Sequence, residues 1–207
     1  MLYQVKFVDL SCLPPADRVL SEKELAFFQT LKFPKRRTEW LGGRLALKTL
    51  AAQAARVSLT QVEVLPQETS GKPQLLVRGE SAKWAYSITH SHGWAAAAIS
   101  QECRFLGIDL EKIQHRIHAW AEDFFHPQEL TAMDDAFLTA LWTRKEAVVK
   151  LLGTGLTLNS FDLRCAGQQI AFYGKALQVY QSLGAPQITL QTHEEPAGFM
   201  FSAAYAR

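Results

Sequence analysis

The hydrophobic and polar residues of the first third of the chain predict a strand followed by two helices. The stretch from Leu2 to Leu10 alternates apolar and polar residues, which is typical of a half-buried strand that ends before the next prolines. Ser21 and Glu24 form a capping-box pattern, which predicts the start of a short helix. A second, longer helix is predicted from Pro34 to about Arg56, because proline favours the first helical position and apolar residues then recur along one face.

Short apolar runs separated by turn residues predict five strands after the long helix. They are Val62 to Leu65, Gln74 to Val77, Trp84 to Thr89, Trp94 to Ser100 and Phe105 to Leu110. Glycine, proline and serine lie between several of these runs, as is typical of turns. The first half of the chain therefore combines helices with several strands.

The second half repeats this mixture. His126-Pro127 predicts a helix start, and Asp134 or Asp135 caps a longer helix that Gly153 and Gly155 end. Four strands are expected at Phe161 to Arg164, Ile170 to Phe172, Ile188 to Thr192 and Phe199 to Tyr205, with a short helix around Lys175 to Leu183. Since helices and strands do not alternate regularly, we predict an α+β fold of two similar halves that divide near residue 100.

Composition narrows the class of protein. The 207 residues are 48% hydrophobic and 20% charged, which is enough to build a core in one large or two small domains. A net charge of +2 gives no support to nucleic-acid binding. Cys12, Cys103 and Cys165 form no metal-binding pattern and are expected to be reduced thiols. With no signal peptide and no long apolar run, we expect a cytoplasmic protein without a membrane partner.

Two carboxylates follow an apolar run at Gly107-Ile108-Asp109-Leu110-Glu111. Residues two apart on a strand point to the same face, so Asp109 and Glu111 are expected to project together. A divalent cation removes the repulsion between two such groups, and magnesium favours one or two carboxylates together with substrate phosphates. The alternative is a solvated strand end at which Lys112 pairs with Glu111.

A second group of polar residues lies in the long helix of the second half. Trp142, Glu146 and Lys150 are four residues apart and form one stripe on that helix. Glu146 and Lys150 could form a surface ion pair, but the neighbouring tryptophan should be partly buried. The stripe is therefore expected to be a cleft wall, at which Glu146 completes a metal site and Lys150 neutralises a phosphate.

Two further segments and a basic stretch have functional and structural interpretations. Ser70-Gly71-Lys72-Pro73 is a tight turn that exposes a lysine, and His90 within Ser87 to His92 is either a phosphate ligand or a half-buried histidine. Six basic residues lie close together, namely Lys32, Lys35, Arg36, Arg37, Arg44 and Lys48. Positive charge near a helix start opposes the helix dipole, which is a small indication that some of these residues bind a ligand.

These features resemble, in order and spacing, the signature of the phosphopantetheinyl transferase family, and specifically its broad-specificity type that activates surfactin synthetase. The G-(I/V)-D segment appears as Gly107-Ile108-Asp109, and the (F/W)-x-x-K-E-(A/S)-x-x-K segment runs from Trp142 to Lys150. The family's G-K-P turn appears as Gly71-Lys72-Pro73, and its S-H-S segment appears as Thr89-His90-Ser91, with threonine in the first position. The resemblance covers residues from about 32 to 157.

The resemblance implies a fold and a set of site residues. It implies a pseudo-two-fold arrangement of two similar subdomains, 1–102 and 103–207, each a small antiparallel sheet with helices packed against it, and coenzyme A bound at their interface. It assigns Mg²⁺ to Asp109, Glu111 and Glu146. It assigns the pyrophosphate to Lys150. The nucleotide end of coenzyme A is assigned to Lys72, Pro73, Thr89 and His90, with Arg37, Arg44, Lys32 and Lys35 in addition.

The implied reaction transfers the phosphopantetheine arm of coenzyme A to a serine of a carrier protein and releases adenosine 3',5'-bisphosphate. Such phosphoryl chemistry depends on positioning and on charge neutralisation, which Mg²⁺ and Lys150 would supply. Glu146 would take the serine proton, either directly or through a magnesium-bound water. Acyl, polyketide and peptidyl carriers all remain open as apo partners. A monomer is expected, because one chain supplies both halves of the site.

Two other functions remain open at this point. A different metal-dependent phosphoryl enzyme, such as a nuclease or phosphatase, could use the same three carboxylates, but it would leave the Lys72 turn and His90 unexplained. A basic module of residues 32–48 could instead bind nucleic acid, and its binding would then depend steeply on salt.

Overall fold

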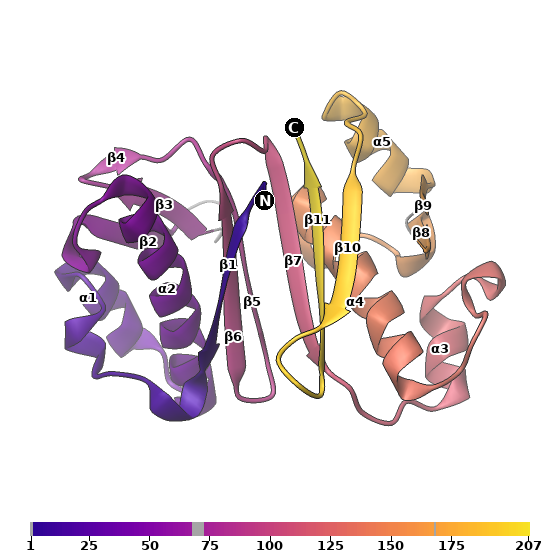
Figure 1. Cartoon of the computed structure of the whole chain (residues 1–207), viewed down its shortest axis with the longest axis horizontal. Coiled ribbons are helices and arrows are strands. Elements are labelled where there is room, and N and C mark those ends of the chain that lie inside the picture. Colours follow the sequence, from indigo (N-terminus) through magenta and orange to yellow (C-terminus); the bar gives the residue numbers. More distant parts are fainter. Residues whose placement is uncertain (1, 68–72, 168) are drawn as a thin grey trace. The chain divides into compact units, whose positions relative to one another are not determined.

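The chain forms two compact units, Met1–Gln101 and Glu102–Arg207 (Figure 1). The computed structural model describes residues 2–67, 73–167 and 169–207. Each unit combines helices with small antiparallel sheets, so the predicted α+β fold class is confirmed.

In the first unit a three-stranded antiparallel sheet carries one long helix. The sheet has the order β1 (Gln4–Asp9), β6 (Trp94–Ser100), β5 (Ala85–Ser91), and α2 (Pro34–Ala55) packs mainly on β6 and β1. A smaller sheet consists of β2 (Val62–Pro66), β3 (Pro73–Val77) and β4 (Glu80–Ser81). The short helix α1 (Glu22–Thr30) precedes α2.

Local sequence explains the ends of both helices in this unit. Ser21 and Glu24 form the predicted capping box at the start of α1, and Pro34 is the first residue of α2. Arg56 ends α2 in the left-handed conformation, with φ of 54°. The core between α2 and the sheets is apolar, with Leu47, Leu50, Val62, Val64 and Ile99 among its buried residues.

The second unit has the same arrangement of a long helix on a three-stranded sheet. The sheet has the order β10 (Thr189–Glu194), β11 (Phe199–Ala206), β7 (Phe105–Lys112), and α4 (Asp135–Leu152) packs on β7 and β11. The remaining elements are α3 (His118–Phe124), the hairpin of β8 (Leu163–Ala166) and β9 (Gln169–Phe172), and α5 (Gly174–Ser182). In both units the last strand lies in the centre of the main sheet.

Two predicted element boundaries are wrong. A helix does not begin at His126-Pro127, where the chain forms only the 3-10 turn Pro127–Glu129, and α3 lies before it instead. α3 was missed because Ile117 at its N-cap has no side chain that can accept a hydrogen bond. The strand expected from Phe161 begins only at Leu163, since Asn159 caps another 3-10 turn there.

The long helices are amphipathic rather than apolar throughout. Of the helices in the parts of the chain that the structure describes, none is long and apolar enough to cross a bilayer.

Candidate functional site

A glycine brings strand β7 close to helix α4. A Cβ atom on Gly107 would lie 2.1 Å from the backbone oxygen of Ala147 and 2.4 Å from the backbone nitrogen of Leu151. Only glycine therefore permits this approach of strand to helix. Because residues two apart on a strand share a face, Asp109 and Glu111 lie on the same side of β7 as Gly107, toward α4.

Lys150 of α4 meets Asp109 of β7 in a largely buried ion pair. The distance from Lys150 Nζ to Asp109 Oδ1 is 2.7 Å, and the two side chains are 29% and 6% exposed. Lys150 is thus paired with a strand carboxylate rather than with Glu146 on the helix surface, as one interpretation of the sequence had it. The pair places a cation at the most buried carboxylate of the predicted site.

Glu146 is electrostatically coupled to both strand carboxylates. Burial raises the pKa of Glu146, the negative charges of Asp109 and Glu111 raise it further, and Lys150 opposes this effect. Within residues 2–67, 73–167 and 169–207, however, no three acidic, histidine or cysteine side chains form a ready-made metal site. The structure therefore has three interacting carboxylates and a lysine, and magnesium ligation by the carboxylates stays a prediction.

Arg116 is a neighbour of this cluster that was not singled out from the sequence. Burial lowers the pKa of Arg116, whereas the charges of Glu111, Asp135 and Asp109 act in the opposite direction. Its guanidinium carbon lies 4.2 Å from the centre of the Trp120 ring. A signal was present in the sequence, because Arg116 follows the paired carboxylates by five residues, but this spacing alone does not indicate a contact.

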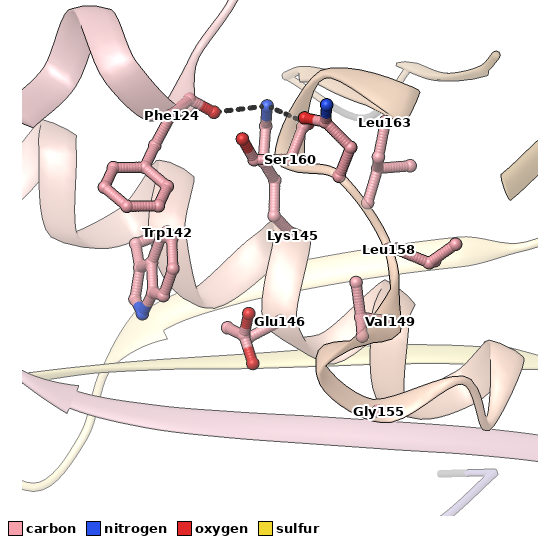
Figure 2. Close-up of a pocket in the computed structure, with 10 residues that line it drawn as sticks. Phe124, Trp142, Lys145, Glu146, Val149, Gly155, Leu158, Ser160 and Leu163 are labelled. Atoms are coloured by element: carbon pink, nitrogen blue, oxygen red, sulfur yellow. Dashed lines mark hydrogen bonds between the residues drawn. The ribbon is translucent and has the colours of Figure 1, made fainter. Parts of the chain in front are cut away.

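A pocket of about 210 Å³ lies beside Glu146 in the second unit. Figure 2 shows Glu146 and Val149 on one side, Phe124 and Trp142 on another, and Leu158 and Leu163 across from them. The lining is mainly apolar, so a carboxylate borders a largely hydrophobic cavity. Such a cavity suits an uncharged, flexible chain next to a charged group.

Trp142 belongs to an aromatic cluster, as the stripe on the helix led us to expect of a half-buried residue. Its ring centre is 5.6 Å from that of Trp120 and 5.3 Å from that of Phe124. These contacts fix one end of the stripe formed by Trp142, Glu146 and Lys150, and they provide the aromatic wall of the pocket.

The predicted nucleotide-binding residues of the first unit lie in separate groups. His90 on β5 is 3.3 Å from Arg36, measured from His90 Nε2 to Arg36 Nη1, and its Nδ1 lies 3.7 Å from Glu39. Lys35 lies 3.9 Å from the same Glu39 oxygen. Arg36, which the sequence did not single out from its basic neighbours, is therefore the arginine that contacts His90.

Arg37 and Arg44 face aromatic rings instead. The Arg37 guanidinium lies 4.5 Å from the Phe28 ring centre, and that of Arg44 lies 4.1 Å from the Trp40 ring centre. Burial lowers the pKa of Arg44 to about 10. Arg37 and Lys32 line a shallow surface groove of about 410 Å³. Lys48 is fully buried against Glu24, so the suggestion that it shares in an exposed basic patch is wrong.

Three other residues predicted to contact coenzyme A are Pro73, Thr89 and Lys72. Pro73 begins β3, and its carbonyl accepts a hydrogen bond of 2.9 Å from the Tyr86 hydroxyl. Thr89 is buried on β5 opposite Ala96. Lys72 lies outside the described residues. The coenzyme A contacts assigned to these residues stay predictions.

Comparison with known proteins identifies the family. The model of the 4'-phosphopantetheinyl transferase superfamily matches residues 105–197, which contain Asp109, Glu111, Glu146 and Lys150. The chain is 34% identical over 89 residues to the holo-(acyl-carrier-protein) synthase of Geobacillus sp., covering 40% of this chain and 73% of that protein. It is 31% identical over 146 residues to the 4'-phosphopantetheinyl transferase HetI of Nostoc sp., covering 66% of this chain and 61% of that protein. The chain therefore belongs to the 4'-phosphopantetheinyl transferase superfamily.

Part of the chain is also similar to a solved structure. The holo-(acyl-carrier-protein) synthase of Bacillus anthracis, in complex with CoA (3',5'-ADP), matches with a TM-score of 0.38 and 26% identity, covering 47% of this chain and 91% of that one. The chain spans less than two thirds of the length of HetI.

Proposed function

We propose that this protein transfers the phosphopantetheine arm of coenzyme A to a serine of an apo carrier protein in a magnesium-dependent reaction. The observation that carries the proposal is the group formed by Asp109, Glu111, Glu146 and Lys150 in the second unit, within the part of the chain that the family model matches. A general fold likeness alone would not support a reaction, because function depends on the site.

The carboxylates of this group are the kind of donor that a magnesium ion would take, although in the described residues they do not converge on a ready-made metal site. Burial and the charges of Asp109 and Glu111 raise the pKa of Glu146, so the protein holds carboxylates close together at an electrostatic cost. A hard divalent cation would relieve this cost, and carboxylate oxygens are its preferred protein ligands. When bound, the ion would neutralise charge on the pyrophosphate of coenzyme A.

The side chains of the protein would then direct the displacement at phosphorus. The serine oxygen forms a bond to the phosphorus that bears the pantetheine arm, and the bond from this phosphorus to adenosine 3',5'-bisphosphate breaks. Lys150 would stabilise the charge that develops on the leaving group. Glu146 would accept the serine proton, and its raised pKa makes it a stronger base than an ordinary glutamate.

The pocket beside Glu146 would take the pantetheine arm. The arm is a flexible, uncharged chain, and the lining of Phe124, Trp142, Val149 and Leu158 is chiefly apolar. Since Glu146 lies at the edge of this cavity, an arm bound there would have its phosphate end near the carboxylates. The aromatic wall would also exclude water, which competes with serine as the attacking group.

The surroundings of the basic residues argue against the nucleic-acid alternative. Lys48 is buried with Glu24, Arg44 stacks on Trp40, and Arg36 contacts His90. Lys48 and Arg44 are therefore not available to a phosphate backbone, and the exposed basic residues of this stretch are limited to the start of α2 and the segment before it. The hydrolytic alternative keeps the same carboxylates and is distinguished by experiment.

The test is incubation of the purified protein with coenzyme A, magnesium and a panel of apo carrier proteins, followed by intact-mass measurement. We expect at least one carrier to gain the mass of a phosphopantetheine group. A carrier whose acceptor serine is replaced by alanine serves as the control and should stay unmodified. Hydrolysis of simple phosphate esters without modification of any carrier would instead favour a nuclease or phosphatase.

A further inference from the structure

A second buried lysine on α4 takes no direct part in the proposed chemistry. Lys145 Nζ lies 2.9 Å from Glu129 Oε2, and the two side chains are 3% and 0% exposed. Glu129 Oε2 also accepts a hydrogen bond of 2.8 Å from the backbone nitrogen of His126, and its Oε1 accepts one of 2.7 Å from that of Cys165. This carboxylate therefore joins the segment before α4 to strand β8.

The ammonium of Lys145 has two further acceptors, both on the walls of the pocket. It donates to the carbonyl of Phe124 at 2.9 Å and to that of Ser160 at 3.0 Å (Figure 2). Together with Glu129, these acceptors use all three donors of a lysine ammonium. Phe124 is the last residue of α3 and Ser160 lies just before β8, so one atom holds together two segments far apart in sequence.

The first unit contains a matching pair in a different setting. Lys48 of α2 pairs with Glu24, and both side chains are fully buried. Glu24 accepts hydrogen bonds from the backbone nitrogens of Ser21, at 2.8 Å, and Val64, at 2.7 Å. Both pairs thus tie a long helix to the segment before it and to the first strand after it. Lys145 differs by holding, in addition, the walls of a cavity that borders Glu146.

We infer that Lys145 is a positioning residue, which fixes the direction of Glu146 and the shape of the pocket beside it. Lys145 and Glu146 are adjacent on α4, so three hydrogen bonds to Lys145 restrict rotation of the helix at Glu146. The same bonds keep the Phe124 and Ser160 walls at a fixed separation. This inference rests on the proposed transfer, and it assigns no contact with substrate to Lys145.

Two matched double variants distinguish an effect of Lys145 on the position of Glu146 from a general effect on the stability of the protein. Lys145→Met with Glu129→Gln and Lys48→Met with Glu24→Gln each replace one buried pair by neutral side chains of similar size. A single substitution would leave a buried charge without its partner and unfold the protein for that reason. Because a misplacement of about 1 Å can cost on the order of a hundredfold in rate, kcat should fall about that much in the second-unit variant.

The Michaelis constants and the first-unit variant provide the controls. In the second-unit variant the rise in KM for coenzyme A should be smaller than the loss in kcat, since loosened pocket walls affect only the pantetheine arm, and the first-unit variant should keep kcat within about threefold. Equal losses of kcat in the two variants, or none in either, would overturn the inference and leave Lys145 with a purely structural part. If the second-unit variant does not fold, Lys145→Arg is tested in its place. This substitution keeps the positive charge but replaces the compact ammonium group with a planar guanidinium group, which cannot make the same three hydrogen bonds.

Hydrogen exchange provides a readout that does not need activity. The second-unit variant should lose protection at residues 124–130 and 158–163, while residues 21–30 and 62–66 keep theirs. The first-unit variant should show the reverse. Unchanged protection at residues 158–163 would contradict the anchoring of the pocket wall. A wild-type protein that transfers nothing would refute the proposed function, and the exchange comparison would still decide whether Lys145 holds the walls.

Discussion

In each unit a long helix lies on a three-stranded antiparallel sheet and contributes a buried lysine to an ion pair, Lys48 with Glu24 in the first unit and Lys145 with Glu129 in the second. When the two helices are aligned at these lysines, Thr49 occupies the position of Glu146. Gln53 likewise occupies the position of Lys150. The stripe that carries the charged residues in the second unit is therefore uncharged in the first.

The difference separates the features that the two units share from the residues of the proposed site. Buried ion pairs, helix caps and sheet order are common to both units, so they specify the fold rather than the chemistry. Asp109, Glu111, Glu146 and Lys150 belong only to the second unit, and all of them lie where α4 approaches β7. Positions on the first-unit helix thus serve as internal controls for variants of the second.

The largest expected effect is at Glu146. Glu146→Gln keeps the size of the side chain but removes the proposed base and one negative charge. We expect transfer to fall on the order of a thousandfold, since a general base and an electrostatic contribution are lost together. The matched first-unit variant Thr49→Val should keep near-normal turnover. Comparable turnover in Glu146→Gln and wild type at saturating coenzyme A and magnesium would remove Glu146 from the site.

Lys150→Ala should have the next largest effect. Loss of one preorganised contact to the leaving group typically costs on the order of a hundredfold in turnover. Melting temperature should fall as well, because the substitution leaves the buried Asp109 carboxylate without its ion-pair partner, so turnover is compared per folded molecule. Gln53→Ala is the control and should be neutral, since Gln53 is exposed. Lys150→Arg should restore only part of the turnover, because a planar fork replaces a point charge.

A variant of Lys150 that keeps more than about a third of wild-type turnover would contradict its part in leaving-group stabilisation. Lys150 would then only balance the charge of Asp109, its ion-pair partner in the structure.

Glycine substitutions compare the two helix–sheet contacts. In Gly107→Ala the new methyl group would meet backbone atoms of α4 at 2.1 and 2.4 Å, so the strand and the helix must separate. We expect a loss of about 3 kcal/mol in the free energy of unfolding, near the upper end for overpacking, together with reduced turnover. In Gly42→Ala the nearest atom, at 2.1 Å, is the flexible end of the Leu10 side chain.

The loss in Gly42→Ala should be about 1 kcal/mol or less, because Leu10 can move and alanine favours the helix. Urea unfolding of the two variants measures the difference. Equal destabilisation would show that the contact of β7 with α4 tolerates an added methyl group as well as the contact of α2 with its own sheet does.

A change in the first unit should act on substrate binding rather than on turnover. If His90 contacts the ribose phosphate of coenzyme A, His90→Ala should raise the KM for coenzyme A about tenfold, as expected for the loss of a charge-assisted hydrogen bond. Dephospho-coenzyme A lacks this phosphate. The substitution should therefore reduce activity less with dephospho-coenzyme A than with coenzyme A. Equal losses with both substrates would leave His90 as a structural partner of Arg36 and Glu39.

The smallest effect is a pH dependence of stability in magnesium-free protein. Burial and the charges of Asp109 and Glu111, opposed by Lys150, raise the pKa of Glu146 in the folded state. The folded protein then binds more protons than the unfolded chain above the ordinary glutamate pKa, so its stability falls as pH rises through this window. Glu146→Gln cannot ionise, so it lacks the part of this pH-dependent loss of stability that Glu146 causes. The variant should melt at a higher temperature than wild type near neutral pH. Melting curves in a chelator from about pH 5 to about pH 8 provide the measurement.

Local sequence signals predicted much of this fold, and the spacing of charged residues suggested the candidate site. The capping box at Ser21 and the proline at Pro34 depend on neighbouring residues only, and both helices begin where these signals indicate. Helix α3 lacks such a signal at Ile117 and is held by tertiary contacts of Trp120 and Phe124 with Trp142. Partners distant in sequence, such as Lys145 with Glu129 and Arg36 with His90, depend on the fold and could not be predicted from spacing.

The proposed activity is transfer of a group from coenzyme A to a carrier protein rather than hydrolysis of coenzyme A. Its most direct test is to measure, in one reaction, the adenosine 3',5'-bisphosphate released and the carrier protein modified. Transfer predicts equal amounts of the two products with wild-type protein, and neither above background with Glu146→Gln. Release of the bisphosphate without modification of the carrier, or unchanged yields in Glu146→Gln, would contradict the account.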